Sequence, residues 1–460
     1  MGRSPHRVPI PSARGAALAA VPIAFAVGAA LAHALLRAAP AQLGIDLAQP
    51  LVVVTAWGAY GLGLFALLAA AVAAGVAGLV AALWPAWRQG SGPSLRATLT
   101  LAALALLAAL AWPVVFSSDV YAYAAYGDAL LHGRDPYVAV ARSFHDAFVD
   151  AARWQWGGAS FPVCVYGPVY VAFAALAVAL GGGKLGASLW ILRVATALAF
   201  LGSIALLNAA LAGRPRRRLA VAVFALNPVA LWSAAEGHND VLMLLAVLAA
   251  FVALRRGRTA LGGVTLGLTP LVKMAGVIAG PVVLAYFWAR RDPRARRFAI
   301  FLLLGCIVAG VLLVPFQLKA LGALGTHGHY APQFSLQALL GVIPALLVAG
   351  AIAALGVRDL SRGRFSGIVW LTIALWLAIP NPYPWYALWI LPVAVVAPPG
   401  RPAVALWAVT ISALLRYLPD AFGNIDHLQA AALTLAQLAP LVWSATQVNA
   451  ALAQKVTPEL

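Results

Sequence analysis

The chain has 460 residues, of which 63% are hydrophobic and only 10% are charged. Soluble proteins carry about 25% charged residues, so this composition excludes a set of soluble domains. The formal net charge of +18 lies mostly in short arginine clusters between apolar runs, without a basic, aromatic-interleaved domain that binds DNA or RNA, so we expect no nucleic-acid partner.

The first apolar run, which reaches Leu36, follows a basic N-terminal segment. It is longer than the apolar core of about 7–15 residues that a signal peptide has. We therefore expect a retained membrane anchor whose N-terminus lies in the cytoplasm.

Apolar runs that can cross a hydrocarbon layer of about 30 Å recur along the chain. In chain order they predict spans at 15–37, 51–84, 95–116, 185–212, 219–235, 240–255, 259–272, 274–289, 298–316, 335–356, 367–380, 385–397, 403–418 and 429–452. Two short pairs, 259–272 with 274–289 and 367–380 with 385–397, also fit re-entrant hairpins, so we expect about 12–14 crossings. No internal repeat interrupts the series, which predicts one integral-membrane domain over residues 1–460.

Arginine clusters separate many of these spans, at 214–218, 255–258, 290–297 and 358–364. Lys and Arg accumulate in the cytoplasmic loops of membrane proteins, so these clusters are expected inside. The apolar stretch 169–180 rises only about 18 Å as a helix, which is too short to span. If it did cross, the cluster at 214–218 would lie outside. We therefore expect a juxtamembrane helix there, within a large outer loop at 117–184.

That outer loop opens with SSDVYAYAAYGDALLHGRDPY at 117–137, a polar and aromatic segment directly after an apolar span. At about 100° per residue, Asp119, Tyr123 and Tyr126 share one face of a short helix, and Asp128 lies on the opposite face. Because Asp119 stands where the preceding span leaves the bilayer, it is the acid best placed over a membrane cavity. The structural alternative is an N-cap aspartate on an interfacial helix with an aromatic belt.

Further polar and aromatic groups fall on the same outer side: EGHND at 236–240, Lys273, THGHY at 326–330 and NPYPWYALW at 381–389. Asn227-Pro228 breaks the span before the first of them, which is costly in lipid unless a cavity or a partner satisfies the backbone. Each group also has a structural explanation, as a solvated loop histidine, a lysine that snorkels to the headgroups or an interfacial aromatic anchor. Their convergence with Asp119 on one membrane face indicates a functional site.

The two cysteines, Cys164 and Cys306, indicate neither a disulfide framework nor a metal site by their number and spacing. His327 and His329 have no carboxylate at a spacing typical of a metal-ligand set. We expect no metal ligands among the candidate residues; the sequence gives a divalent cation no support but leaves it open.

Together these motifs resemble those of the polyprenol-phosphate-mannose-dependent mannosyltransferases of bacterial cell envelopes, integral-membrane enzymes of the GT-C glycosyltransferase class. Five segments carry the resemblance, in the family's order from the first large outer loop almost to the C-terminus: 117–137, VYGPVY at 165–170, NPVALWSAAEGHNDVLM at 227–243, LGLTPLVKMAGVIAGP at 266–281 and NPYPWYALWILP at 381–392.

The resemblance implies an all-α, GT-C-like bundle of transmembrane helices, with juxtamembrane helices of the first large outer loop forming the roof of a cavity. It also implies a reaction: a hexose is transferred from a polyprenyl-phosphate carrier to a cell-envelope glycan or glycolipid acceptor. The family resemblance indicates that this hexose is mannose. The reaction would take place on the extracytoplasmic face of the bacterial inner membrane, with inversion at the anomeric carbon. A lipid-linked donor reaches the site through the bilayer, so no nucleotide-binding fold and no further cofactor is expected.

In this class the acid at the end of the first outer-loop span acts as the base, and the matching residue is Asp119. A departing phosphate needs positive charge, for which Lys273 is the first candidate and Arg134 the second. Aromatic rings that stack on sugars and polar groups that bind sugar hydroxyls complete the expected site: Tyr123, Tyr126, Tyr166, His238, Asn239, Asp240, Trp385 and Tyr386.

Two departures from the class concern the metal and the acceptor. Ser118-Asp119 replaces the two adjacent acids of many members, so a metal-binding acidic pair is not expected there. Without an appended soluble domain, the loops and the cavity are expected to recognise the acceptor.

The alternative function is a secondary transporter or a flippase of a lipid-linked saccharide. Such proteins place ionisable groups near the bilayer midplane at a repeat interface. The acids here gather at one edge and no repeat is found, so the sequence favours the glycosyltransferase.

Overall fold

The computed structural model describes residues 12–39, 59–89, 92–117, 119–138, 147–155, 163–314, 332–398, 400–422 and 425–453. Within these ranges the regular structure is helical, apart from one isolated antiparallel bridge between Tyr166 and Lys273. The all-α class expected from the sequence is confirmed.

The α-helices, in chain order, are α1 (Ser12–Arg37), α2 (Ala59–Gln89), α3 (Leu95–Leu110), α4 (Asp119–Leu131), α5 (Ala147–Gln155), α6 (Pro168–Leu180), α7 (Leu185–Ala210), α8 (Arg217–Ala225), α9 (Pro228–Ala235), α10 (Asp240–Arg255), α11 (Thr259–Leu268), α12 (Ala279–Ala289), α13 (Ala295–Leu313), α15 (Leu336–Leu340), α16 (Val342–Ser361), α17 (Ser366–Ala378), α18 (Ala387–Val396), α19 (Arg401–Ser412), α20 (Tyr417–Phe422) and α21 (His427–Ala453). Short 3-10 helices occupy Thr269–Leu271, Met274–Ile278, Pro384–Tyr386 and Ala413–Arg416.

Six helical segments of the described chain are long and apolar enough to cross a membrane: Ala16–Arg37, Ala59–Trp84, Leu185–Ala210, Ala295–Leu313, Val342–Ser361 and Arg401–Pro419. The bent pair α8 and α9 adds a seventh if it counts as one span, and several apolar helices are shorter. The chain is therefore a polytopic membrane protein, and the expected number of about 12–14 crossings stays a prediction.

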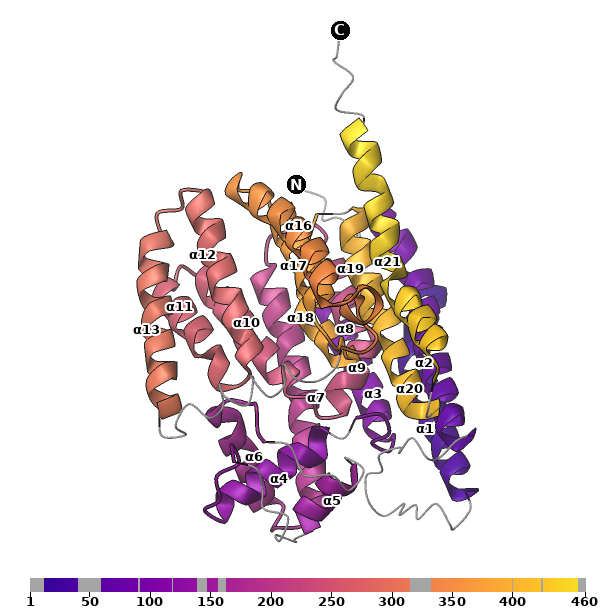
Figure 1. Cartoon of the computed structure of the whole chain (residues 1–460). Helices are drawn as coiled ribbons and strands as arrows, with labels where there is room; N and C mark the ends of the chain where they lie inside the picture. Colours follow the sequence, from indigo (N-terminus) through magenta and orange to yellow (C-terminus); the bar gives the residue numbers. More distant parts are fainter. Residues whose placement is uncertain are drawn as a thin grey trace, which may run out of the picture.

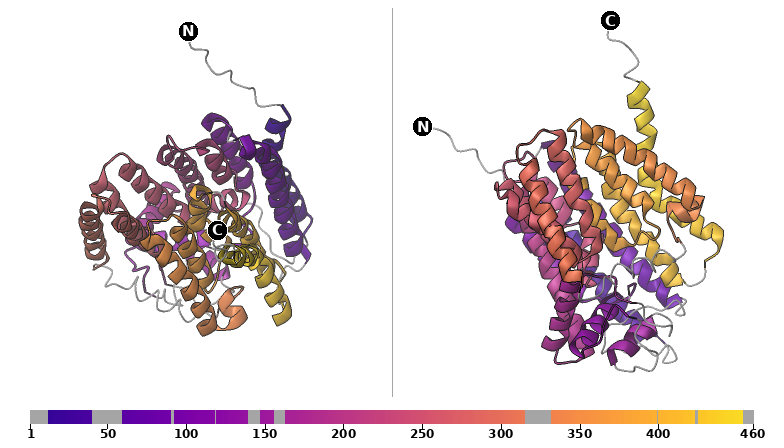
Figure 2. Two further views of the ribbon diagram at one scale, coloured as in Figure 1. Left: turned by 90° about the horizontal axis from the view of Figure 1, so that it is seen from above. Right: turned by 60° about the vertical axis from the view of Figure 1, so that its left-hand side comes forward.

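The helices run side by side as a bundle, and α4, α5 and α6 gather at one end of it (Figure 1). A view from a second direction shows the same arrangement (Figure 2). The predicted short helix at 169–180 is α6, which begins at Pro168 after the N-cap Gly167. A Cβ atom at Gly127 of α4 would lie 2.5 Å from the backbone of Ala174 in α6, so the two helices cross at very close range.

Contacts between loops gather the arginine clusters. Arg255 donates a hydrogen bond to the carbonyl oxygen of Ala212, beside the cluster at 214–218. Arg294 donates to the carbonyl of Leu254 at 3.3 Å, and Arg290 donates to the carbonyl of Gly363 at 3.3 Å. The α12–α13 and α16–α17 connections lie at the end of the bundle away from α4–α6 (Figure 1). The basic loops thus share one end of the bundle, as the sequence predicts, and the cytoplasmic location of this end stays a prediction.

The break predicted at Asn227-Pro228 separates α8 from α9, whose axes differ by 51°. The Asn227 side chain caps α9 by accepting from the N–H of Ala230 and donates to Thr410 Oγ1 at 2.7 Å. The Asn227 side chain therefore caps the first turn of α9 and is itself held by a partner on α19.

Two predicted spans differ from the structure. The span expected at 335–356 is broken at Gly341, which has φ +85° and separates α15 from α16. The span expected at 95–116 is helical only to Leu110, and Pro113 follows soon after. Both breaks lie at residues that disfavour a continuous helix, one by its left-handed φ and one by its missing N–H.

Candidate active site

Asp119 is the first residue of α4, and its backbone N–H donates to Ser117 Oγ at 3.3 Å. One helical turn later, the hydroxyl of Tyr123 donates to Asp119 Oδ2 at 3.0 Å. The predicted common face of these two residues is therefore confirmed. The Asp119 side chain remains 19% exposed, whereas Tyr123 is buried.

The turn between α9 and α10 brings His238 to Asp119. Its Nδ1 lies 3.6 Å from Asp119 Oδ2, and its Nε2 lies 3.4 Å from Glu236 Oε2. Gly237 makes this turn with φ +96°, a conformation that other residues rarely adopt. On its other side, His238 stacks on the ring of Trp385 with centroids 4.1 Å apart.

Charge interactions set the protonation of this pair. Burial lowers the pKa of His238, but the two carboxylates outweigh it and raise the pKa to about 9, so the imidazole is charged at neutral pH. Burial raises the pKa of Asp119, but His238, Lys273 and the Tyr123 hydroxyl outweigh this and hold the pKa below its usual value. Asp119 is thus a carboxylate, able to accept a proton.

Lys273 lies in the turn between α11 and α12, where its backbone pairs with that of Tyr166. Gly167 donates its N–H to the Val272 carbonyl at 3.2 Å. A Cβ atom at Gly167 would lie 2.1 Å from the carbonyl oxygen of Leu271, so only glycine permits this approach. The segments VYGPVY and LGLTPLVKM therefore form one structural unit.

The Lys273 side chain is held by an ion pair and ringed by aromatic side chains. Its Nζ donates to Asp240 Oδ2 at 2.8 Å and to Asn239 Oδ1 at 3.2 Å. The indole N–H of Trp389 donates to the other oxygen of Asp240 at 2.5 Å. Three ring centroids lie 5.3–5.6 Å from Nζ, within cation–π range: those of Tyr166, Tyr386 and Trp389.

Exposure divides the predicted site residues into two groups. Asp119 and Lys273 retain 19% and 12% of their side-chain surface, and Tyr166 and Tyr386 are half-buried. The other members that line or support this region are buried: Tyr123, Tyr126, His238, Asn239, Asp240 and Trp385. The first group therefore keeps surface that a ligand can reach, and the second is enclosed by the protein.

Residues 16–290 match a protein family described as alpha-(1->6)-mannopyranosyltransferase, N-terminal domain. The chain belongs to this family. Alpha-(1->6)-mannopyranosyltransferase A of Mycobacterium tuberculosis (strain ATCC 25618 / H37Rv) is 27% identical over 342 residues. The match covers 64% of this chain and 64% of that relative's length. No solved structure matches the chain.

The region that matches the mannopyranosyltransferase family contains Asp119, the turn 236–240 and Lys273, but it ends before the aromatic segment 381–389. The site is therefore completed by residues that follow the matched region, since Trp385 stacks on His238 and Trp389 bonds to Asp240.

Two predicted members lie farther from this centre. The Tyr126 hydroxyl donates to the Val163 carbonyl at 3.4 Å, and its ring lies 6.2 Å from that of Tyr166. Arg134 follows the far end of α4, a helix of 13 residues that begins at Asp119 and is about 20 Å long. The substrate roles of both residues stay predictions. The segment 326–330, with His327 and His329, lies outside the described residues.

Four residues of the site were missed at the sequence level: Arg193, Glu236, Trp389 and Tyr417. A signal existed for three of them. Glu236 belongs to the EGHND motif and Trp389 ends the NPYPWYALW motif, and Arg193 is a lone charge in an apolar span, where charged residues tend to be functional or paired. Arg193 is buried and donates to the carbonyls of Leu110, Trp112 and Ala235. It therefore joins the end of α3 to the last turn of α9.

No group of three or more His, Cys, Asp or Glu side chains that could hold a metal ion occurs in the described ranges. Cys164 is buried and Cys306 is exposed, and both are free thiols.

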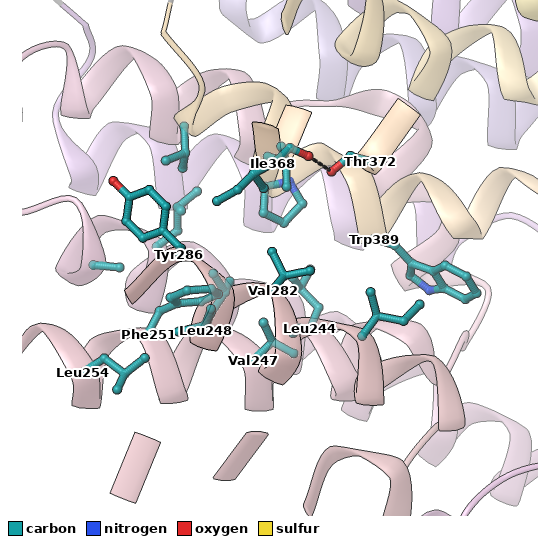
Figure 3. Close-up of a pocket in the computed structure, with 18 of the residues that line it drawn as sticks. Leu244, Val247, Leu248, Phe251, Leu254, Val282, Tyr286, Ile368, Thr372 and Trp389 are labelled. Atoms are coloured by element: carbon teal, nitrogen blue, oxygen red, sulfur yellow. Dashed lines mark hydrogen bonds between the residues drawn. The ribbon is translucent and has the colours of Figure 1, made fainter. Parts of the chain in front are cut away.

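An apolar cavity of about 590 Å³ adjoins the site, between helices α7, α10, α12, α17 and α18 (Figure 3). Side chains of Leu244, Val247 and Val282 project into it, and Trp389 stands at one side (Figure 3). Its lining reaches from Trp389 and Gly276, close to Lys273, to Arg214, Arg255 and Arg294 among the basic loops. We call the three rings around the Lys273 ammonium group, those of Tyr166, Tyr386 and Trp389, the Lys273 cage. Trp389 belongs to this cage and also lines the cavity, so the two share a wall.

Proposed function

We propose that this chain is a membrane α-mannosyltransferase that transfers mannose from a polyprenyl-phosphate carrier to a hydroxyl of a cell-envelope glycan or glycolipid. The reaction takes place on the extracytoplasmic side of the inner membrane. One observation carries the proposal: a partly exposed, ionised carboxylate, Asp119, lies close enough to Lys273 for their charges to interact, at the end of the bundle that α4–α6 cover. Family membership supports the sugar and the linkage.

Asp119 accepts the proton of the acceptor hydroxyl in this proposal. Both Tyr123 and His238 face its Oδ2 atom, and within the described part of the chain no hydrogen bond engages Oδ1. That oxygen is thus available within hydrogen-bond reach of an incoming hydroxyl. The acceptor oxygen bonds to the anomeric carbon, its proton passes to Asp119, and the bond to the carrier phosphate breaks with its electron pair on the phosphate. A single displacement turns a β-linked carrier into an α-linked product.

Lys273 stabilises the departing phosphate. An ammonium group has three N–H donors, and Asp240 and Asn239 take two of them. One donor remains for a phosphate oxygen. The ion pair with Asp240 keeps Lys273 charged in a largely buried position, and Trp389 fixes the other oxygen of Asp240. Fixed positive charge next to a leaving phosphate lowers the barrier to displacement.

The apolar cavity supports a lipid-linked donor. Its wall at Trp389 and Gly276 adjoins the Lys273 cage, so a chain that fills the cavity ends where a phosphate meets the ammonium group. Burial of apolar surface contributes about 25 cal/mol per Å², so a long prenyl chain provides much of the donor affinity.

The experiment uses purified full-length protein in lipid nanodiscs, given radiolabelled polyprenyl-phosphate mannose and an α-mannoside acceptor. We expect labelled product with inverted configuration, and none from a nucleotide-linked mannose. Movement of a fluorescent lipid-linked saccharide across vesicles, without any transfer product, supports the flippase instead.

A further inference from the structure

We infer that Glu236 is a positioning residue, which keeps His238 fixed and charged against Asp119 so that the catalytic carboxylate presents its open oxygen to the acceptor. The inference rests on the proposed function, since it assigns a role in the same reaction to a residue that does not touch the substrate.

The geometry places one imidazole between two carboxylates. His238 Nδ1 faces Asp119 Oδ2 at 3.6 Å, and Nε2 faces Glu236 Oε2 at 3.4 Å. Only the imidazolium form has a proton on each ring nitrogen. The side chains of His238 and Glu236 are 1% and 2% exposed, so neither charge is stabilised by water. A buried carboxylate without a cation is costly, and Glu236 therefore favours the charged form of His238.

Groups remote from the cavity hold Glu236. The hydroxyl of Tyr417 donates to Glu236 Oε2 at 2.7 Å. Arg193 binds the carbonyl oxygen of Ala235, the preceding residue, at 2.7 Å, and its charge interacts with that of Glu236. The position of Glu236 is thus set by α7 and α20.

The charge state of His238 follows from all the groups around it. Two carboxylates face the ring nitrogens and one aromatic ring stacks on the imidazole: those of Asp119, Glu236 and Trp385. Arg193 and the Tyr417 hydroxyl interact with Glu236 instead. Arg193 bonds to three backbone carbonyls and its charge interacts with that of Glu236, while the two carboxylates face the ring nitrogens directly. Removal of either carboxylate therefore makes it easier for the His238 imidazolium to lose one of its two ring protons.

The arrangement also explains the geometry of Asp119. Tyr123 and His238 approach the same oxygen, Oδ2, from α4 and from the turn after α9. If His238 loses its charge or rotates, only the Tyr123 hydroxyl still fixes the carboxylate. The acceptor-facing oxygen then loses its fixed direction, which slows the chemical step more than it weakens substrate binding.

The test is Glu236→Gln, which keeps shape and removes the charge. We expect kcat to fall by as much as about a hundredfold, the order of loss that a misplaced reacting group causes, with little change in the acceptor KM. The alkaline limb of the kcat/KM profile, near pH 9 in the wild type, should move toward neutral pH.

Tyr417→Phe removes a hydrogen bond but no charge, so its alkaline limb should stay in place. The control is Asp128→Asn, which removes the partner of His132 on the far side of α4 and should leave the profile unchanged.

Titration of isotope-labelled histidine by NMR, with His238 assigned from a His238→Gln variant, separates this inference from the proposed function. A fall in the His238 pKa in Glu236→Gln supports the inference even if the wild type transfers no mannose, in which case the proposed function fails alone. An unchanged histidine titration, or a lower kcat with an unmoved alkaline limb, overturns it. If Glu236→Gln does not fold, Glu236→Asp, which retains the charge, should preserve the alkaline limb, and a shifted limb overturns the inference.

Discussion

Tyr166 and Lys273 pair through their backbones in an antiparallel bridge. The bridge joins the segment before α6 to the turn between α11 and α12. It places the ring of Tyr166 over the Lys273 ammonium group, with the centroid 5.6 Å from Nζ. The position of the Lys273 cation therefore depends on the segment that precedes α6.

Gly167→Ala should open this bridge. The new methyl group would lie 2.1 Å from the Leu271 carbonyl oxygen and 2.5 Å from its Cα, and a backbone cannot yield as a side chain can. We expect a free energy of unfolding lower by about 2 kcal/mol or more, seen as a lower Tm, and weaker donor binding. The control is Gly310→Ala in α13, where a Cβ meets open space, and its Tm should not fall. Equal Tm values for both variants contradict the role of the bridge.

Asp119→Asn should abolish most transfer. The amide keeps the size of the side chain and can still accept from Tyr123, but it cannot take the acceptor proton. General-base groups contribute about a hundredfold to ten-thousandfold, so kcat should fall by at least the lower figure. Donor affinity, measured by quenching with a labelled polyprenyl phosphate, should stay close to that of the wild type. Full transfer in this variant removes Asp119 as the base.

Lys273→Met should weaken donor binding more than acceptor binding, because it removes the cation that the proposed function assigns to the carrier phosphate. It also leaves Asp240 buried without its partner, which costs about 3 kcal/mol or more of folding free energy. The double variant Asp240→Asn with Lys273→Met removes both charges, so it should recover Tm without recovering donor affinity. The control is Lys184→Met, which removes the charge of an exposed lysine and should leave donor affinity unchanged. Donor affinity restored in the double variant rejects the role of Lys273.

Local signals made part of this site predictable. Asp119 and Tyr123 are four residues apart, so the helical repeat alone places them on one face. The α8–α9 break could be predicted as well, because Asn227 is a good N-cap and Pro228 fits the first helical turn. These features depend on a few consecutive residues and not on the packing of the bundle.

Other contacts could not be predicted, because they depend on how distant helices pack. Trp389 and Asp240 are 149 positions apart, and Tyr417 and Glu236 are 181 positions apart. No periodicity relates such pairs. The sequence marked Lys273 and Asp240 separately as ligand-binding residues, whereas the structure pairs them with each other. The pairing depends on the backbone bridge that fixes the position of Lys273, and this bridge cannot be predicted from local sequence.

The stability of the protein should decline at alkaline pH because of His238. Its pKa rises from 6.5, the usual value, to about 9 in the folded protein. A raised pKa stabilises the fold fully below pH 6.5, and the stabilisation is lost as the pH rises toward 9, with a total of the order of 3 kcal/mol. Asp119, whose pKa is lowered, acts in the opposite direction and loses its contribution only in acid. The Tm of the wild type should therefore fall between pH 6.5 and 9, and that of His238→Gln should fall less. Parallel slopes for the two proteins would mean that the imidazole carries no charge between its two carboxylates.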